Sequence, residues 1–404
     1  MDGWRECKIG DLLEIKHGYA FQGEYFADAG SHIILTPGNF FDEGGFKDKG
    51  DKEKWYTGPV PSDYVLTEGD LIVAMTEQAE GLLGSSAIIP RSGLYLHNQR
   101  LGLVQVRDDS KTDKRFLYYL FNSKPVRQQI RGSSSGTKIR HTAPSRIADV
   151  KISVPPLPVQ RRIAGILAAY DHLIENNLRR IRILEEMARA LYRELFVHFR
   201  FPGHETVPRV ASPLGPIPKG WEVKKIGNIA ENFDRLRKPL SKMKRAEMPG
   251  EYPYYGAAKV FDYINDYIFD GEYLLMAEDG SVITHDRAPV LQLVNEKFWP
   301  NNHTHVLRGK APVSTHFLYL GMSLVDISPC ITGAAQPKIT QENMNRIPFF
   351  CGPPDLHYDF DRLVAPMIRQ SQVLQRQTQN LRRTRDLLLP RLLSGQTIPR
   401  ETGL

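Results

Sequence analysis

The chain has 404 residues, of which 41% are hydrophobic and 25% charged, and its formal net charge is +7. This length can bury two or more cores, and no uninterrupted apolar run is long enough to span a bilayer. Three cysteines are too few for a disulfide framework, and Met1-Asp2-Gly3 opens no apolar signal segment, so we expect a cytoplasmic protein. The mild positive charge fits nucleic-acid binding but is common among other soluble proteins.

Residues 1–155 are predicted to form a first α+β domain. Short apolar runs at 70–75 and 102–106 alternate with turns rich in glycine and aspartate, which indicates strands, and a short helix is expected near 114–122. The prolines in the run 155–158 end this domain, because consecutive prolines continue neither a helix nor a strand ladder.

The next segment, 156–200, predicts one long helix, from Gln160 to Phe196. Its apolar residues alternate at spacings of four and three, which is typical of a heptad coiled coil and requires a partner helix. Asn177 falls among them, either as a buried amide that selects one register or as a partly exposed side chain. The predicted seam residues are Ile163, Leu167, Tyr170, Ile174, Asn177, Ile181, Leu184, Ala188, Leu191 and Leu195.

A linker rich in proline and glycine opens the segment 201–354, which is predicted to contain a second α+β domain with strands at 273–276 and 290–294. The last segment, 355–404, is predicted to be a second long helix and a tail, with a kink or a late start at Pro366 and an end at Pro390 and Gly395. Its apolar seam is expected at Phe360, Leu363, Met367, Leu374, Leu381 and Leu388, with weaker polar positions at Gln370, Gln377 and Thr384.

The chain repeats itself in order. Gly3-Trp4 returns as Gly220-Trp221, Phe116-Leu117-Tyr118 as Phe317-Leu318-Tyr319, and Pro155-Pro156 as Pro353-Pro354. The stretch before each Phe-Leu-Tyr varies in length, whereas the stretch after each Pro-Pro does not. We interpret this as two variable modules that read different targets and two constant helices with one mechanical task; a duplication without present meaning is the alternative.

The predicted helix length suggests what such modules could read. A helix over 160–196 is roughly 55 Å long at 1.5 Å per residue. Two such helices packed antiparallel would separate the modules by more than one turn of B-DNA, about 34 Å. Two half-sites with an unread gap would fit, but a protein scaffold could use the same spacing.

Candidate DNA contacts lie in two loops at matching places in the repeats, where flexible backbone, hydroxyls and cationic side chains suit phosphate binding. In the first half they are Arg131, Ser133, Ser134, Lys138, Arg140 and His141, and in the second half Thr332, Gln336 and Lys338. Side chains with the chemistry to read base edges are Gln99, Arg100, Asn302 and His303. Each of these residues could equally have a structural role.

No catalytic motif accompanies these candidates. The sequence has no GxxxxGK[ST] phosphate loop and no Asn-Pro-Pro-aromatic tetrapeptide, so no catalytic residue is assigned. His303 and His305 are interpreted as polar loop residues and not as a metal site. The first long helix also carries many arginines off its seam, which would serve subunit docking, the DNA backbone or solubility.

Four strings resemble the specificity subunit of type I restriction–modification enzymes. FVHFRFPGHE (196–205) and GPIPKGWEVKKIG (215–227) are similar to the junction between that family's halves, PPLPVQRRIAGIL (155–167) to the entry into its first spacer helix, and RDLLLPRLLSGQ (385–396) to its ending. Val159 departs from the usual glutamate, and Asp355 follows Pro353-Pro354 without the usual Leu and Glu-Gln, which leaves the start of the second helix open.

The resemblance implies two target-recognition domains and two antiparallel coiled-coil spacer helices that together read a bipartite double-stranded DNA site. It implies as partners two modification (methyltransferase) subunits and, in the restricting complex, restriction (nuclease–translocase) subunits. The chain itself is then expected to be non-catalytic and to bind no cofactor, with S-adenosylmethionine held by the methyltransferase and ATP and Mg by the motor subunit. A coiled-coil scaffold joining two protein-binding domains is the rival hypothesis, and an enzyme acting alone is the third.

Overall fold

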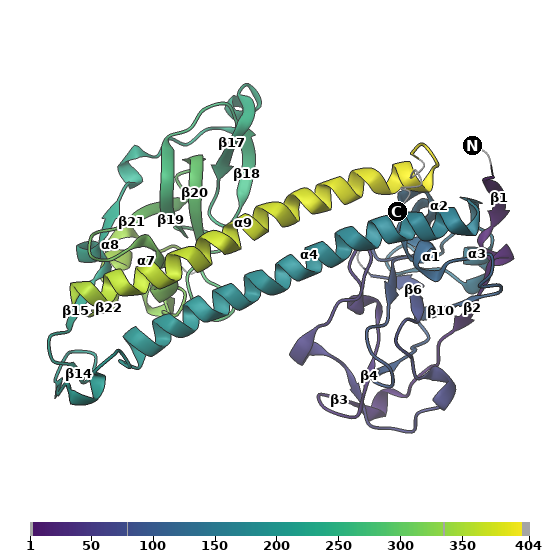
Figure 1. Cartoon of the computed structure of the whole chain (residues 1–404), viewed down its shortest axis with the longest axis horizontal. Helices are drawn as coiled ribbons and strands as arrows, with labels where there is room; N and C mark the ends of the chain where they lie inside the picture. Colours follow the sequence, from purple (N-terminus) through teal and green to yellow (C-terminus); the bar gives the residue numbers. More distant parts are fainter. Residues whose placement is uncertain (1–2, 79, 334–335, 398–404) are drawn as a thin grey trace, which may run out of the picture. The chain divides into compact units, whose positions relative to one another are not determined.

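The computed structural model describes residues 3–78, 80–333 and 336–397. Contacts divide the chain into two units: unit 1 comprises Met1–Glu175 with Thr378–Leu404, and unit 2 comprises Asn176–Gln377. Each unit therefore takes part of both long helices, α4 (Leu157–Tyr192) and α9 (Pro354–Leu393) (Figure 1). The predicted domain boundaries at 155 and 354 lie next to the starts of these helices, and residues 398–404 of the predicted tail lie outside the described residues.

Unit 1 is built on an antiparallel sheet in the order β2 (Leu13–His17), β10 (Leu101–Val106), β6 (Leu71–Ala74) and β8 (Ser86–Ile88). Every side chain of β6 is buried because both faces of the sheet are covered. Leu71 and Val73 face one core and Ile72 and Ala74 another. A second sheet has the order β3 (Phe26–Ala27), β5 (Trp55–Tyr56), β4 (His32–Ile34) and β9 (Tyr95–Leu96).

The helices of unit 1 cover one face of this first sheet. They are α1 (Lys114–Phe121), α2 (Lys124–Gly132) and α3 (Pro144–Ala148). Unit 1 also has a short antiparallel ladder, in which β1 (Arg5–Lys8) pairs with β12 (Lys151–Val154). The start of α4 and the end of α9 complete that core. Asp171 of α4 holds the group together, since it accepts hydrogen bonds from the Tyr119 hydroxyl (2.6 Å) and from Arg385 of α9 (2.7 Å).

Unit 2 has a larger sheet, in the order β16 (Ala230–Asn232), β21 (Thr304–Gly309), β19 (Phe269–Ala277), β20 (Leu291–Pro300), β17 (Pro249–Tyr255) and β18 (Val260–Ile264). Its helices are α5 (Ile226–Ile229), α6 (Lys242–Ala246), α7 (Thr315–Met322) and α8 (Gln341–Asn345). Two short ladders join β13 (Arg209–Val210) with β14 (Ile217–Pro218) and β15 (Glu222–Lys225) with β22 (Pro348–Cys351).

The repeat predicted from the sequence is present element by element. The ladder β1 with β12 corresponds to β15 with β22, and the Phe-Leu-Tyr blocks lie in α1 and α7. Each of these helices begins with a side-chain cap: Asp113 accepts from the Phe116 amide and Ser314 from the Phe317 amide. On α7, His316 lies between Glu272 of β19 (2.9 Å) and Asp361 of α9 (2.8 Å).

The first long helix follows the prediction. All the predicted seam residues of α4 are buried or half-buried, and Asn177 is buried, which decides between its two interpretations. Helix α4 gives way after Tyr192 to a π-helical turn, Arg193–Val197. In unit 2 the segments of α4 and α9 run antiparallel, because Glu185 accepts from Ser371 (3.3 Å) whereas Tyr192, further along α4, lies against Phe360, nearer the start of α9. In unit 1 Asp171 of α4 contacts Arg385 of α9.

The prediction for the second long helix needs three corrections. Helix α9 starts at Pro354, so the late start at Pro366 is wrong, and it continues through Pro390 to Leu393, shortly before Gly395 (φ +73°), where its end was predicted. Leu363 is 50% exposed, and Val364 is buried in its place. The predicted polar positions Gln370, Gln377 and Thr384 are all exposed; the buried ones are Ser371 and Thr378, whose short side chains fit a helix interface that glutamine would overfill.

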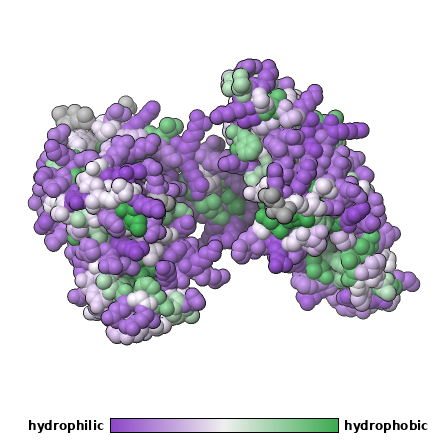
Figure 2. Space-filling view, turned by 180° about the vertical axis from the view of Figure 1, so that it is seen from behind, coloured by the Kyte–Doolittle hydropathy of each residue, from purple (hydrophilic) through white to green (hydrophobic). Residues whose placement is uncertain are grey.

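Polar side chains dominate the surface that Figure 2 shows, with smaller hydrophobic areas between them. Among the described residues no helix combines the length and the apolar character that crossing a membrane requires.

Candidate nucleic-acid interface

The two candidate segments of unit 1 meet at the end of β6. Strand β7 (Thr76–Glu77) follows β6 and pairs with β11 (Arg140–His141), which belongs to the predicted glycine- and serine-rich loop. The Met75 amide donates to the Arg100 carbonyl (3.0 Å), and the Thr142 amide donates to the Met75 carbonyl (2.9 Å). We call this convergence of residues 75–77, 98–100 and 133–142 the sheet-end site of unit 1.

Unit 2 repeats this arrangement at the end of β19. Asp279 forms a bridge with Lys338, and the Glu278 amide donates to the His303 carbonyl (2.9 Å). The turn with Asn302 and His303 therefore lies beside the predicted loop, just as in unit 1. We call residues 277–280, 301–303 and 332–338 the sheet-end site of unit 2; residues 334–335 within it lie outside the described residues.

Both loops are closed in the same way. In unit 1 Ser135 and His141 exchange two backbone hydrogen bonds, of 3.0 and 2.9 Å, and in unit 2 Thr332 and Lys338 exchange two of 2.8 Å. Gly136 (φ +94°) and Gly333 (φ +87°) occupy the left-handed region that such tight loops require. Each bridge thereby gives its loop a fixed base.

Some candidate side chains of unit 1 form hydrogen bonds within the unit, and others are exposed to solvent. Arg131 donates to Glu80, and this hydrogen bond lowers the pKa of the Glu80 carboxyl. The hydroxyls of Ser133 and Ser134 donate to the carbonyls of Ile130 (3.1 Å) and Arg131 (2.6 Å), so they terminate helix α2. The His141 ring lies 3.3 Å from the Thr76 hydroxyl. Lys138, Gln99 and Arg100 are exposed and Arg140 is half-exposed.

In unit 2 the exposed candidates are Asn302, His303, Thr332, Gln336 and Lys338. The His303 ring hydrogen-bonds to the Asp279 carboxylate (2.6 Å), and the Lys338 ammonium lies 3.2 Å from the Glu278 carboxylate. The expectation that His305 is a loop residue is wrong. It lies in β21, is buried, and contacts Asp234 (2.6 Å) and the Ile339 carbonyl (3.0 Å).

Asp234, Glu278 and His305 are the types of residue that bind metals, and their ligand atoms lie close together. However, Arg237 donates to Glu278 (2.7 Å) and lies 3.5 Å from Asp234, so cationic side chains already neutralise both acids. Burial raises the pKa of Asp234, but the hydrogen bond and charge of His305 outweigh it and keep that pKa below its usual value. We therefore interpret this cluster as an ion-pair network that supports the sheet-end site.

Comparison with known proteins matches residues 1–186 and 218–350 to the family model of the type I restriction modification DNA specificity domain. The chain belongs to this family. The two matched segments are the two halves of the repeat, one in each half of the chain.

Individual members of the specificity family are moderately similar. The type I restriction enzyme MjaIX specificity subunit of Methanocaldococcus jannaschii is 27% identical over 296 residues, which covers 70% of this chain and 68% of that protein. A putative type I restriction enzyme specificity subunit of Haemophilus influenzae is 35% identical over 137 residues, about a third of each chain. The crystal structure of the S subunit from M. genitalium has the same fold, with a TM-score of 0.69, 16% identity and coverage of 99% and 97%.

Two acidic residues with a structural role at the sheet-end sites were not predicted from the sequence. Glu77 accepts three backbone hydrogen bonds, from the amides of Gly81, Leu82 and Leu83, and Glu278 binds Arg237 and Lys338. A signal was present, because Met75-Thr76-Glu77 and Met276-Ala277-Glu278 stand equally far ahead of the two Phe-Leu-Tyr blocks. Each glutamate therefore stabilises the sheet-end site of its unit.

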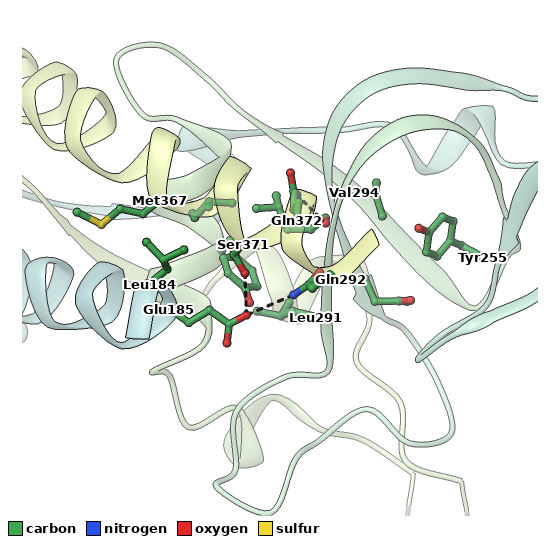
Figure 3. Close-up of a pocket in the computed structure, with 13 residues that line it drawn as sticks. Leu184, Glu185, Tyr255, Leu291, Gln292, Val294, Met367, Ser371 and Gln372 are labelled. Carbon is green, nitrogen blue, oxygen red and sulfur yellow. Dashed lines mark hydrogen bonds between the residues drawn. The ribbon is translucent and has the colours of Figure 1, made fainter. Parts of the chain in front are cut away.

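Unit 2 also has a cavity of about 280 Å³ between α4, α9 and β20 (Figure 3). In Figure 3 Glu185 points toward Ser371 of α9, and its carboxylate accepts from this hydroxyl (3.3 Å) and from Gln375 (3.4 Å). Leu184, Leu291 and Met367 supply apolar walls. These polar groups are used in joining the two helices.

Proposed function

We propose that this chain is a sequence-specific DNA-binding subunit that reads a bipartite duplex site, with one half-site for each sheet-end site. The observation that supports this most is the repetition of one construction with different side chains. In both units a strand end, a turn and a bridged loop converge, yet Gln99 and Arg100 in unit 1 are replaced by Asn302 and His303 in unit 2. One scaffold with two sets of readers suits two different half-sites.

The exposed side chains have the required chemistry. Arginine can donate two hydrogen bonds to guanine in the major groove, and glutamine or asparagine can pair with adenine. Lys138, Arg140 and Lys338 suit phosphate contacts, which position a protein on DNA without reading sequence. We assign base reading to Gln99, Arg100, Asn302 and His303, and backbone contacts to the lysines and Arg140.

We further propose that the chain performs no catalytic step and docks two methyltransferase subunits and nuclease–translocase subunits. The support is that relatives are named specificity subunits of restriction enzymes. S-adenosylmethionine, ATP and Mg would then be bound by those partners, and the complex would act in the cytoplasm, where chromosomal DNA is exposed to it.

The test is to map methylated adenines genome-wide in cells that express the chain with its candidate methyltransferase, and in cells with the methyltransferase alone. We expect a split motif with a fixed gap that requires this chain. Arg100→Ala should relax one half of the motif and leave the other half intact, because each good bidentate contact is worth about 1–3 kcal/mol.

Arg91→Ala is the matched control, since Arg91 is exposed and the neighbouring Ile89 amide binds Asp70 at the other end of β6. It should leave both halves of the motif unchanged. A soluble, assembled complex that yields no motif would contradict the proposal and favour the protein-scaffold hypothesis. Relaxation of both halves by Arg100→Ala would contradict one half-site per unit.

A further inference from the structure

The segment between β16 and β17 in unit 2 concentrates positive charge. From Arg235 to Arg245 it carries no acidic residue, and its cationic residues are Arg235, Arg237, Lys238, Lys242, Lys244 and Arg245. A run of this kind is often a mobile solvated loop. Here, however, the segment is tied to the unit at both ends.

Two arginines of the segment point inward and fix it. Arg237 donates to Glu278 (2.7 Å) and to the carbonyls of Asn302 (3.2 Å) and Thr304 (2.8 Å). Arg245 donates to Asp262 (3.2 Å) and lies over the Tyr254 ring.

The backbone between these arginines is fixed as well. The Trp299 indole donates to the Lys238 carbonyl (2.6 Å), and the Leu240 amide donates to the Tyr254 hydroxyl (3.0 Å). The segment is therefore a rigid part of unit 2.

The other cations face outward. Lys244 pairs with Glu247 (3.1 Å), whereas Arg235, Lys238 and Lys242 are exposed, and no hydrogen bond or ion pair joins their side chains to any residue that the structure describes. Like charges held close together on a fixed backbone repel one another. No hydrogen bond or ion pair to a described residue offsets the charges of these three side chains, which points to an external polyanion.

We propose that Arg235, Lys238 and Lys242 form a phosphate-binding track that holds duplex DNA beside the half-site read by unit 2. The proposal rests on the proposed DNA-binding function and extends it to residues outside the sheet-end site. Its position follows from Arg237, which joins the segment to Glu278 and to the turn that carries Asn302. The track therefore begins where base reading is assigned and continues to α6, so DNA seated on the sheet-end site meets it next.

The corresponding segment of unit 1 lacks these cations. The residues that follow β2, Gly18–Ala27, contain neither lysine nor arginine. Backbone affinity outside the half-site should therefore be unequal between the two units, with unit 2 contributing more of the salt-dependent binding.

The test compares the full chain with the variant Arg235→Gln, Lys238→Gln, Lys242→Gln, using fluorescence anisotropy over a series of salt concentrations. One duplex carries the motif mapped by methylation and the other carries the same bases scrambled. Each lost phosphate contact should reduce the slope of log K against log salt by about 0.9, so the variant should lose about 2 to 3 in slope on both duplexes. The ratio of the two affinities should stay constant.

The matched control is Lys219→Gln, Lys225→Gln, Lys310→Gln, which removes the same charge from exposed positions elsewhere in unit 2. Lys310 lies beyond the other end of β21, where its amide binds the Ile229 carbonyl. For this control variant, the slope of log K against log salt should match that of the unmodified chain. If the triple variant does not fold, Lys242→Gln alone should lower the slope by about 0.9.

The possible failures are distinct. An unmodified chain that binds neither duplex would overturn the proposed function itself. Normal binding by the unmodified chain, with an equal slope in the track variant, would overturn the track alone. A variant that binds DNA normally but no longer assembles with the methyltransferase would also overturn it and assign these cations to an acidic protein surface.

Discussion

Replacing His357 with phenylalanine should stabilise unit 2, and the gain should grow as the pH falls. His357 of α9 is 1% exposed and lies against the rings of Phe196 (centroids 5.1 Å apart) and Phe317 (4.7 Å). Neither of its ring nitrogens has a hydrogen-bond partner among the described residues. Each unmet buried polar group costs about 1–3 kcal/mol. Because phenylalanine is slightly larger than histidine, the strain of fitting it offsets part of this cost. We therefore expect the free energy of unfolding to rise by about 1–2 kcal/mol at neutral pH.

The pH dependence follows from the depressed pKa of this histidine. Burial and, to a smaller extent, the charge of the nearby Lys224 lower the pKa of His357 from 6.5 to about 4. Between these values the unfolded chain binds a proton that the folded chain does not, so the stability of the unmodified protein falls as the pH drops through this window. The full difference is about 3 kcal/mol, and phenylalanine removes it.

The measurement is urea unfolding at a series of pH values from 7 to 4, with hydrogen exchange in α7 to follow unit 2 by itself. His285→Gln serves as the control, because the His285 side chain is exposed to solvent. The difference in unfolding free energy between His357→Phe and the unmodified chain should widen steadily as the pH falls. A difference that stays constant over the whole range would refute the reasoning.

The remaining predictions concern three other contacts. Burial lowers the pKa of His316, but the carboxylates on either side outweigh it and raise the pKa to about 9. The stabilisation from this histidine is therefore complete below pH 6.5 and disappears as the pH rises through 9. His316→Gln should lower the free energy of unfolding in urea by about 2–4 kcal/mol at neutral pH, and its stability should fall less at alkaline pH than that of the unmodified chain. Gly18→Ala would place a Cβ 2.0 Å from a backbone oxygen in the turn of the sheet-end site, so gel shifts should show at least about tenfold weaker DNA binding, whereas Gly23→Ala, with nothing within 4 Å, should bind normally. Asp171→Ala leaves the Tyr119 hydroxyl without its acceptor and Arg385 with Asp386 alone, and should cost unit 1 about 1–3 kcal/mol, seen as faster hydrogen exchange in α1 with α7 unchanged.

Period and spacing were sufficient for the first helix but not for the second. The seam of α4 is strongly apolar, so its heptad could be read directly, and Asn177 was its one ambiguous position. In α9 polar residues are buried at Ser371 and Thr378 as well as at His357, while leucine stands at the exposed position 363. The hydrophobic pattern therefore places the seam of α9 one residue away from its true position. The true seam becomes clear only from the packing of the small hydroxyl side chains against α4.

The candidate site was predictable in its parts and not in its assembly. Matching loops in the two repeats predicted residues 131–141 and 332–338 as candidates, and polar chemistry predicted Gln99, Arg100, Asn302 and His303. That each loop lies beside its turn depends on strand pairing between distant segments, which no local pattern contains. The buried His305 was misread for the same reason, because its partner Asp234 lies in another element.

The division of the two long helices between the units has a consequence for synthesis. Leu392 and Leu393, near the end of the chain, belong to the core formed with β2, β6 and α1 near its beginning. The first unit therefore cannot complete its core on the ribosome until Leu392 and Leu393 have emerged, and it must remain partly open while the second unit is made. A chain truncated just before Leu392 would thus lose part of the core of the half that was translated first.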